Sequence, residues 1–504
     1  MTSPSTPQGF ARIPKVAWLA GGGLAIAVAI LLILVPSRAQ APRVAEMLPA
    51  KETVGFVALE SPDQFLKEFD RAAVGLSDDE KRALSAFLST DSRVAALGFD
   101  PAQAAGWQKA GVDPERGLAI ALDARSPSGT ALPAFAWVAD GPPRSPKADA
   151  LKWQPQEKWS VASLSAAAWQ APTGPRLAGD PVLRAAFADM PTGPRAAIYA
   201  HADGVLAALK PQFTDKKLAA LEHVTQRVRG FSLVMAPDRA AGRIVLSTEG
   251  TESLRQIFGT EAPKDPFSHF LPKDGVVALR VSLNLQEIFD GLMTWLPPQW
   301  MEARLGLASG RLGLLAMTGV DWSQLERALA GQAVLAVDLS AAATPDVPVH
   351  WLALLTVRDA ALADAAVQHF AQTASQRGKS VVAKPIEGHT GWVSQDPPVV
   401  VVRVDHTLIV APTELDVVHA LHRPDPLPDT PDLDGDVVLG FLLHSTPQPV
   451  KTDAANWQAA FARLEPMSMA LRRDPHGLRL EASAFPLSSV VHVAGWFLRP
   501  KPGE

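Results

Sequence analysis

Two stretches of this chain begin alike: LPAKETVGFVALESPDQFLKEF at residues 48–69 and LPKDGVVALRVSLNLQEIF at residues 271–289. Each reads as a Leu-Pro pair, then a strand rich in β-branched residues (54–59 and 276–281), then a helix. The first helix opens with SPDQ (61–64), which supplies an N-cap, a first-turn proline and a capping-box partner. The second keeps its apolar residues at the spacing of a helix that packs on a core. These paired starts predict that one folding unit occurs twice.

Further segments match in the same order along both halves. A buried strand ends in Asp123 in the first half and in Asp338 in the second, and a later strand ends in His201 and in His444. Other matches are LGFDP (97–101) with TGVDW (318–322), Ala171-Pro172-Thr173 with Ala411-Pro412-Thr413, and Thr214-Asp215 with Thr452-Asp453. A fixed order of repeated segments is the signature of a duplication.

Each half combines short strands, Pro/Gly turns and interleaved helices. This pattern is typical of α+β domains, in which a mainly antiparallel sheet carries its helices on one face. We therefore expect an α+β domain over residues 48–260 (repeat 1), a linker over 261–270 and a second α+β domain over 271–504 (repeat 2).

The N-terminal region contains an uncharged apolar run, VAWLAGGGLAIAVAILLILV, at residues 16–35. Twenty helical residues span about 30 Å, the thickness of a bilayer core. A cleaved signal peptide has a shorter apolar stretch of about 7–15 residues. We expect an uncleaved transmembrane anchor, with cleavage or a buried soluble helix as the alternatives.

The charges around this run predict its orientation. Arg12 and Lys15 precede it without any acidic residue beside them, which favours a cytoplasmic N-terminus. The chain is then expected to have a cytoplasmic tail (1–15), the anchor, a linker (36–47) and its bulk outside the cytoplasm. That location is the periplasm if the cell has two membranes.

Composition excludes several classes of function. With 47 Lys and Arg against 52 Asp and Glu, the net charge of −5 does not suit nucleic-acid binding, which needs a basic face. The absence of cysteine removes disulfides, thiolate metal sites and cysteine nucleophiles. The sequence also lacks the phosphate-binding motifs GxxxxGK[ST] and GxGxxG, the serine motifs GxSxG and SxxK, and the zinc motif HExxH. We therefore expect no cofactor, no metal and no nucleic-acid partner, and the sequence favours a protein without enzyme activity.

The Leu-Pro starts, the upstream anchor and the segment GVDPERGLAIAL (111–122) resemble uncharacterised bacterial membrane-anchored envelope proteins. Those proteins are built from domains of unknown function, and a short segment similar to LPADT precedes each domain. Here Lys51-Glu52-Thr53 and Lys273-Asp274-Gly275 depart from that pattern. The resemblance implies an envelope location and no activity that could be assigned to residues.

Four polar residues at equivalent strand ends are candidates for a site: His201, His444, Asp123 and Asp338. Histidine titrates near neutrality, so the two histidines could be symmetric proton-handling sites. Strand-end histidines also hydrogen-bond to loops, and strand-end aspartates also begin turns. The pair His419 and His422 has the i, i+3 spacing of a metal motif, but it also fits the polar face of a surface helix.

Tryptophan is frequent, with 13 residues against one tyrosine. Trp107, Trp137, Trp322 and Trp351 lie beside apolar runs at places that match between the halves, which predicts core positions, with a groove for lipid or glycan as the alternative. Trp295, Trp300 and Met301, around a Pro-Pro pair, are the best candidates for an exposed apolar patch.

These features support three hypotheses about function. The first is a membrane-anchored extracytoplasmic protein that binds or scaffolds an envelope partner. The second is a lipid- or glycan-binding module that uses a tryptophan-lined cleft. The third is a hydrolase with an unrecognised site built from histidine and aspartate.

Overall fold

The structure is a computed structural model of the 504-residue chain. It describes residues 43–46, 48, 50, 53–59, 61–83, 104–109, 111–113, 115–123, 134–140, 152–156, 159–163, 174–190, 196–210, 214–235, 239–259, 267–339, 349–395, 398–427, 437–444, 466–483 and 491. The expected anchor and its flanking tail lie outside these residues. Within the described part, no helix is long and apolar enough to cross a membrane.

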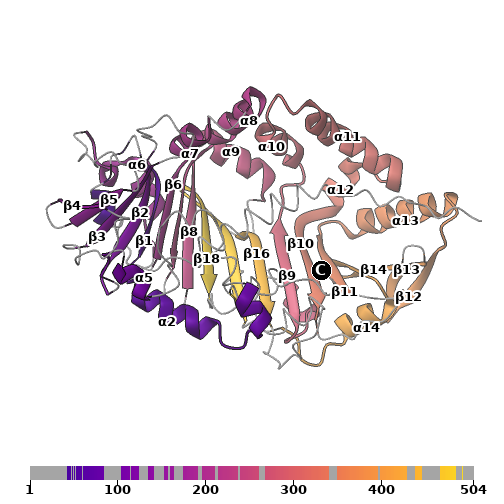
Figure 1. The fold of residues 1–504 in the computed structure, drawn as a ribbon. Helices are drawn as coiled ribbons and strands as arrows, with labels where there is room; N and C mark the ends of the chain where they lie inside the picture. The colour runs from indigo at the N-terminus through magenta and orange to yellow at the C-terminus, as the bar shows by residue number, and fades with distance from the viewer. Residues whose placement is uncertain are drawn as a thin grey trace, which may run out of the picture.

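Groups of strands and groups of helices follow one another along the chain (Figure 1). The described strands are β1 (Thr53–Leu59), β2 (Leu118–Asp123), β3 (Ala134–Asp140), β4 (Lys152–Gln156), β5 (Trp159–Ser163), β6 (Ala196–His201), β7 (Val228–Met235), β8 (Arg239–Leu246), β9 (Val276–Ser282), β10 (Leu329–Asp338), β11 (His350–Val357), β12 (Val381–Ile386), β13 (His389–Gln395), β14 (Pro398–Val404), β15 (Thr407–Ala411), β16 (Val437–His444), β17 (Met467–Asp474) and β18 (Gly477–Ser483). The described helices are η1 (Arg43–Glu46), α2 (Pro62–Ala72), α5 (Ala104–Lys109), η2 (Leu177–Gly179), α6 (Pro181–Phe187), α7 (Ala202–Leu209), α8 (Asp215–Thr225), α9 (Thr248–Ile257), η4 (Ser268–Phe270), α10 (Ile288–Trp295), α11 (Met301–Thr318), α12 (Trp322–Ala328), α13 (Ala360–Gln376) and α14 (Glu414–Leu421).

The 18 described strands form one continuous sheet. Their pairings are all antiparallel and give the order β4-β5-β3-β2-β1-β6-β7-β8-β18-β17-β16-β9-β10-β11-β15-β14-β13-β12. Figure 1 shows this order from left to right, with α7, α8, α9 and α10 along the upper edge of the sheet. The α+β class and the antiparallel sheet are as predicted.

The two halves of the sheet have the same order and the same register around their first strands. β1 lies between β2 and β6, and Phe56 is opposite both Ala121 and Tyr199. β9 lies between β10 and β16, and Ala278 is opposite both Ala336 and Leu442. The stretches 54–59 and 276–281 thus occupy corresponding places in the sheet.

The halves meet where β8 pairs with β18, and each of these is the last described strand of its half. The offset of 238 residues that the sequence predicts, read from Thr214 and Thr452, would make Gly242 the counterpart of Leu480. These two residues lie directly opposite each other, so the junction is symmetric about them. The sequence predicted one sheet per repeat, and the structure joins both into one. The physical reason is that an unpaired β8 or β18 would leave a row of open backbone hydrogen-bonding groups.

One face of the sheet, here called the covered face, packs against short helices that lie at matching places in the two halves. In the first half, Leu183 and Ala186 of α6 pack on a cluster that includes Phe56 and Tyr199. In the second half, the corresponding helix α14 packs on a cluster that includes Ala278. Proline at the start of α6 and the Asp180 side chain, which accepts from two backbone amides, fix where that helix begins.

Arg243 lies on the covered face at the junction, and its side chain is fully buried. Its guanidinium donates to the backbone oxygens of Ala185 and Ala188, at 2.6 Å each, beside the C-terminus of α6. It also donates to the Asp474 carboxylate at 2.7 Å. A buried cation is stable here because the helix end and the carboxylate of the other half both supply acceptors.

Candidate functional site

The four strand-end residues lie at corresponding ends of strands. His201 ends β6 and Asp123 ends β2, and the side chain of Asp123 lies outside the described residues. His444 ends β16 and Asp338 ends β10. Val276 of β9 is opposite both Asp338 and His444. The His444 imidazole and the Asp338 carboxylate therefore lie in one row on the same face of the sheet.

The Asp338 and His444 side chains have separate partners. Two strand spacings of about 4.8 Å separate β10 from β16, which places the two backbones about 10 Å apart. Arg423 donates to Asp338 at 3.2 Å, and the His444 Nδ1 lies 3.6 Å from the Asp274 carboxylate. This arrangement contains no direct histidine–aspartate pair between the predicted residues, and a role for them stays a prediction.

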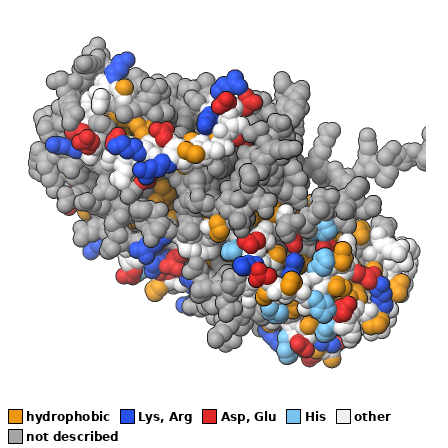
Figure 2. Space-filling model, turned by 90° about the horizontal axis from the view of Figure 1, so that it is seen from below, with side chains coloured by type: hydrophobic (Ala, Val, Ile, Leu, Met, Phe, Trp, Pro, Cys, Tyr) orange, Lys and Arg blue, Asp and Glu red, His pale blue; other side chains and the backbone are white. Residues whose placement is uncertain are grey.

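Histidines gather at the lower edge of the second half. Seen from below, they lie among acidic and hydrophobic side chains on the right of the molecule (Figure 2). His350 Nδ1 lies 2.7 Å from Asp416, and His422 Nε2 lies 3.2 Å from Glu387. The predicted pair His419 and His422 belongs to this edge. Among the described residues, no three His, Cys, Asp or Glu side chains are placed to hold a metal ion.

The predicted tryptophan patch is exposed in part. Trp300 and Met301, at the start of α11, are 48% and 62% exposed, while Trp295 is half-buried. Trp351 of β11 does not correspond to Trp137 of β3, because the registers place Phe135 opposite Leu122 and Trp351 opposite Val337. The match expected from the sequence is therefore displaced by two residues along the strand.

The face of the sheet opposite the covered face, here called the open face, is apolar in the second half. Its side chains on β9, β10 and β16 form three rows across the strands. The rows are Val337–Val277–Leu443, Leu335–Leu279–Phe441 and Ala333–Val281–Leu439. An antiparallel sheet with one face in water normally alternates apolar and polar residues. Strands β9 and β10 do not show this alternation, because their polar residues Arg280 and Gln332 are buried on the covered face instead.

Several of these apolar side chains are exposed. Leu335 is 50% exposed, Leu279 42% and Leu439 37%, although large aliphatic side chains are usually among the most buried. They share one face and lie on adjacent strands, so they form a contiguous patch rather than scattered residues. Contiguous apolar patches mark binding surfaces.

The open face continues to a pocket at the upper edge of the sheet. The row of Leu439 extends to Leu471 and Leu480 of β17 and β18. Two residues further along each strand, Arg473 of β17 is opposite Leu478 of β18. Both line an open pocket of about 490 Å³ between the β17–β18 hairpin and α9.

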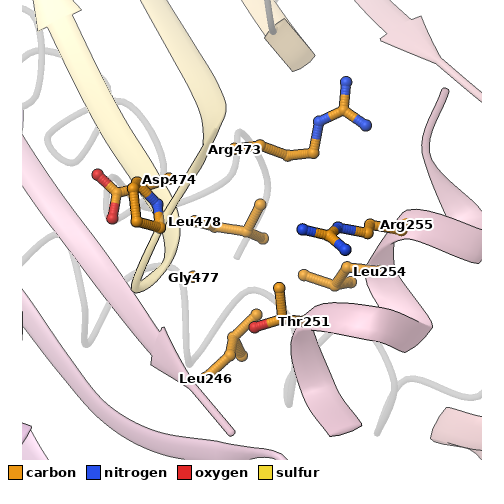
Figure 3. A pocket seen from close by; sticks show the side chains of 9 residues that line it. Leu246, Thr251, Leu254, Arg255, Arg473, Asp474, Gly477 and Leu478 are labelled. Carbon is orange, nitrogen blue, oxygen red and sulfur yellow. The ribbon is translucent and has the colours of Figure 1, made fainter. Parts of the chain in front are cut away.

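Figure 3 shows how side chains line this pocket. Leu246, Leu254 and Leu478 form an apolar floor, and the guanidinium groups of Arg255 and Arg473 lie on one side. The Asp474 carboxylate points away from them. It is held by Arg243 on the covered face and by the His476 amide at 2.9 Å. The pocket therefore combines apolar side chains with two cations.

Sequence reasoning did not find this surface or its two arginines. A signal was present, because VVALRVS (β9) and VVLGFLLH (β16) place apolar residues at almost every position. Such runs indicate strands that are covered on both faces. The two arginines come from segments more than 200 residues apart, which only the fold brings together.

No protein-family model, curated protein or solved structure matches this chain.

Proposed function

We propose that this chain is a membrane-anchored, extracytoplasmic binding protein whose open face holds the acyl part of a lipid. The observation that carries the proposal is the contiguous exposed patch of Leu279, Leu335 and Leu439. Burying each such side chain against an apolar ligand gains about 1.5–3 kcal/mol at most. The catalytic motifs that the sequence lacks also favour binding over catalysis, and the separate partners of Asp338 and His444 weigh against the hydrolase hypothesis.

The expected anchor gives this proposal its setting. Residues 16–35 would hold the protein at a membrane, where lipid is the most abundant apolar ligand. The resemblance of the Leu-Pro starts to bacterial envelope proteins points to the same location. Scaffolding of an envelope protein on the same surface is the competing use of the patch, and the experiment below separates the two.

Duplication is part of the proposal. We propose that repeat 1 (48–260) and repeat 2 (271–504) are copies of one unit, fused through β8 and β18. The shared register around β1 and β9 and the symmetric pairing of Gly242 with Leu480 support it. A binding surface that crosses the junction would then be a product of the fusion.

A photoreactive lipid tests the proposal with the full chain in its membrane. Vesicles that contain the protein and a phospholipid with a diazirine-bearing acyl chain are irradiated, and the labelled peptides are identified by mass spectrometry. We expect label on the peptides of β9, β10 and β16 in addition to the anchor. Label confined to residues 16–35 would overturn the proposal, and crosslinks from the open face to a second protein in native membranes would favour scaffolding.

Matched variants control this experiment. Leu279→Asn with Leu335→Asn makes the exposed patch polar and should remove most of the label from the sheet. Leu415→Asn changes a leucine that is 59% exposed on α14 and should leave the label unchanged. Because all three side chains are exposed, we expect each variant to fold.

A further inference from the structure

Helix α11 (Met301–Thr318) presents apolar side chains to water. Figure 1 shows it as the outermost helix at the upper right of the molecule. Met301 and Leu305 are 62% and 60% exposed, and Leu315 near the other end is exposed as well. Of the exposed side chains that the structure describes on this helix, only that of Glu302 is charged. A surface helix normally turns charged and polar residues outward, so the outer side of α11 is suited to a partner rather than to water.

The rest of the protein holds the first part of α11 along one side. Within residues 301–310, Arg304 and Leu307 are half-buried, and the other eight residues are exposed. Arg304 donates to the carbonyl oxygens of Met293 and Leu296 at the C-terminal end of α10, at 3.0 and 2.7 Å. Residues three apart lie on the same side of a helix, so this attachment leaves the other sides of α11 accessible.

Four exposed apolar residues form a strip along α11. Met301, Leu305, Ala308 and Leu315 follow one another at intervals of four, three and seven residues. At 3.6 residues per turn, this spacing keeps them within about 80° around the helix axis. Intervals of four and three residues are the pattern by which one helix packs against another in a coiled coil. A helix that lies on a lipid surface has a strongly charged face instead, so the pattern of α11 favours a protein helix as its partner.

The strip is complementary to a second copy of itself. Met301 and Leu315 each lie seven residues from Ala308, which is therefore the centre of the strip. In an antiparallel pair with its two-fold axis at Ala308, each Met301 meets the partner's Leu315, and the small alanines let the backbones approach in the middle. Such a contact uses the same patch on both copies, as two-fold symmetric dimers do. It also keeps the two Glu302 carboxylates about 18 Å apart along the axis, where salt screens their repulsion.

The size of the contact determines its strength. α11 has 18 residues, which gives a length of about 27 Å, and a helix is about 10 Å wide. The pair would cover about 270 Å² on each copy, well below the value of about 800 Å² that is usual for a stable interface. We therefore expect a weak dimer whose population depends on concentration.

We propose that α11 is a dimerisation element, and that the strips of two copies of this chain pack antiparallel about a two-fold axis at Ala308. The inference is independent of the proposed function, because the strip lies on α11 and the acyl surface lies on β9, β10 and β16. It assigns a partner to the exposed apolar patch that begins at Trp300 and Met301.

Single cysteines test the contact, because the chain has no cysteine of its own. The full chain with Ala308→Cys is oxidised by copper phenanthroline in phosphatidylcholine vesicles, and disulfide-linked dimers are measured on non-reducing gels. A disulfide needs Cα atoms about 4.4–6.8 Å apart, which residues at a two-fold axis can reach. Ala303→Cys is the matched control, since Ala303 is exposed on the far side of the same helix. We expect about tenfold more dimer from Ala308→Cys than from Ala303→Cys.

A mixture of two variants tests the direction of the helices. Met301→Cys and Leu315→Cys, carried on chains with different affinity tags, are reconstituted together and oxidised. Antiparallel packing predicts disulfides between the two variants and few within either one. Disulfides within each variant instead would show parallel helices and would overturn the proposed two-fold axis.

A charge placed in the strip gives a measurement without cysteine. Leu305→Glu should raise the dissociation constant of the dimer by about tenfold or more, because the contact would bury an unpaired carboxylate. Sedimentation of the full chain in detergent measures this constant, and Ala303→Glu should leave it unchanged. Leu279→Asn with Leu335→Asn, which alters the acyl surface, should also leave it unchanged, so the two proposals fail separately.

Three further results would overturn the inference. The first is an equal disulfide yield from Ala308→Cys and Ala303→Cys, and the second is a parent protein that stays monomeric at its highest soluble concentration. The third is label on the α11 peptides from a lipid with a diazirine-bearing acyl chain while the cysteine variants stay monomeric, which would assign the strip to a membrane surface. Circular dichroism verifies the fold of each variant, and if Leu305→Glu misfolds, the cysteine variants decide.

Discussion

Arg243 connects elements that lie far apart in the sequence. Its guanidinium donates to the carbonyls of Ala185 and Ala188 at the C-terminal end of α6 and to the Asp474 carboxylate, 231 residues away. Removal of one member of a buried ion pair leaves the other charge without compensation, which typically costs about 3–5 kcal/mol.

We therefore expect Arg243→Ala to lower the free energy of unfolding by about 3–5 kcal/mol. Chemical denaturation followed by tryptophan fluorescence measures this change. Arg82→Ala removes an exposed ion pair and should change it by less than about 1 kcal/mol. A loss of the same small size in both variants would show that the buried cation contributes nothing beyond a surface one.

Asp474 should make stability depend on pH. Burial acts to raise the pKa of its carboxyl, but hydrogen bonds from the His476 amide and from Arg243, with the charge of Arg243, lower that pKa below its ordinary value of 3.8. A group with a lowered folded-state pKa stabilises the fold above its unfolded-state pKa, and this contribution is lost as the pH falls through the folded-state pKa. We expect the free energy of unfolding to decrease from about pH 4 downward.

Urea titrations between neutral and acid pH measure that decrease. Asp474→Asn should be less stable than the parent protein at pH 7 and should lose less stability on acidification, because the titrating group is gone. An equal acid loss in the variant and the parent would assign the effect to other carboxylates.

At the scale of elements, two helical glycines predict opposite results for one substitution. Gly204 of α7 lies against β1, and a Cβ there would meet the Val54 Cα at 2.7 Å. Gly306 of α11 has no neighbouring atom within 4 Å of such a Cβ. Only backbone displacement could relieve the contact at Gly204, since the obstructing atom is main chain.

Gly306→Ala should stabilise the protein by about 0.5–1 kcal/mol, because alanine restricts the unfolded chain and favours helix. Gly204→Ala should destabilise it by about 1–3 kcal/mol through overpacking. Thermal unfolding of both variants provides the comparison. If Gly204→Ala stabilised the protein, α7 would not be packed closely against β1.

The sequence predicted some elements well and others poorly. The strands at 54–59 and 276–281 and the turn after Asp474 carry local signals in β-branched residues and Pro/Gly pairs, so they could be found. The pairing of β8 with β18 could not, because it joins residues with no local relation and depends on the position of the repeats in space. The pocket of Arg255 and Arg473 was missed for the same reason. The sequence of β9 shows apolar residues on both faces of the strand. Only the exposure of Leu279 in the structure shows that one of these faces is an accessible apolar surface.

At the scale of the whole molecule, the topology is open to a direct measurement. The charges of Arg12 and Lys15 predict a cytoplasmic N-terminus and an exported body. A reporter that is active only outside the cytoplasm, fused after Glu504, should therefore be active. The same fusion with a reporter active only in the cytoplasm should be silent.

The results of these fusions distinguish the alternatives for the N-terminal run. A silent export reporter would contradict the topology. An active export reporter on a protein whose mature N-terminus is Gln40 would keep the location and replace the anchor by a cleaved signal.

β1 is the first strand in the described part of the chain, yet it lies inside the sheet with antiparallel neighbours on both sides. Any tension transmitted through the residues ahead of Thr53 acts along this strand. It loads the hydrogen bonds to β2 and to β6 in shear, and all of them share the force at once. An edge strand under the same pull would resist through the hydrogen bonds to one neighbour instead of two. The placement of β1 therefore makes its N-terminal end a mechanically strong point of attachment.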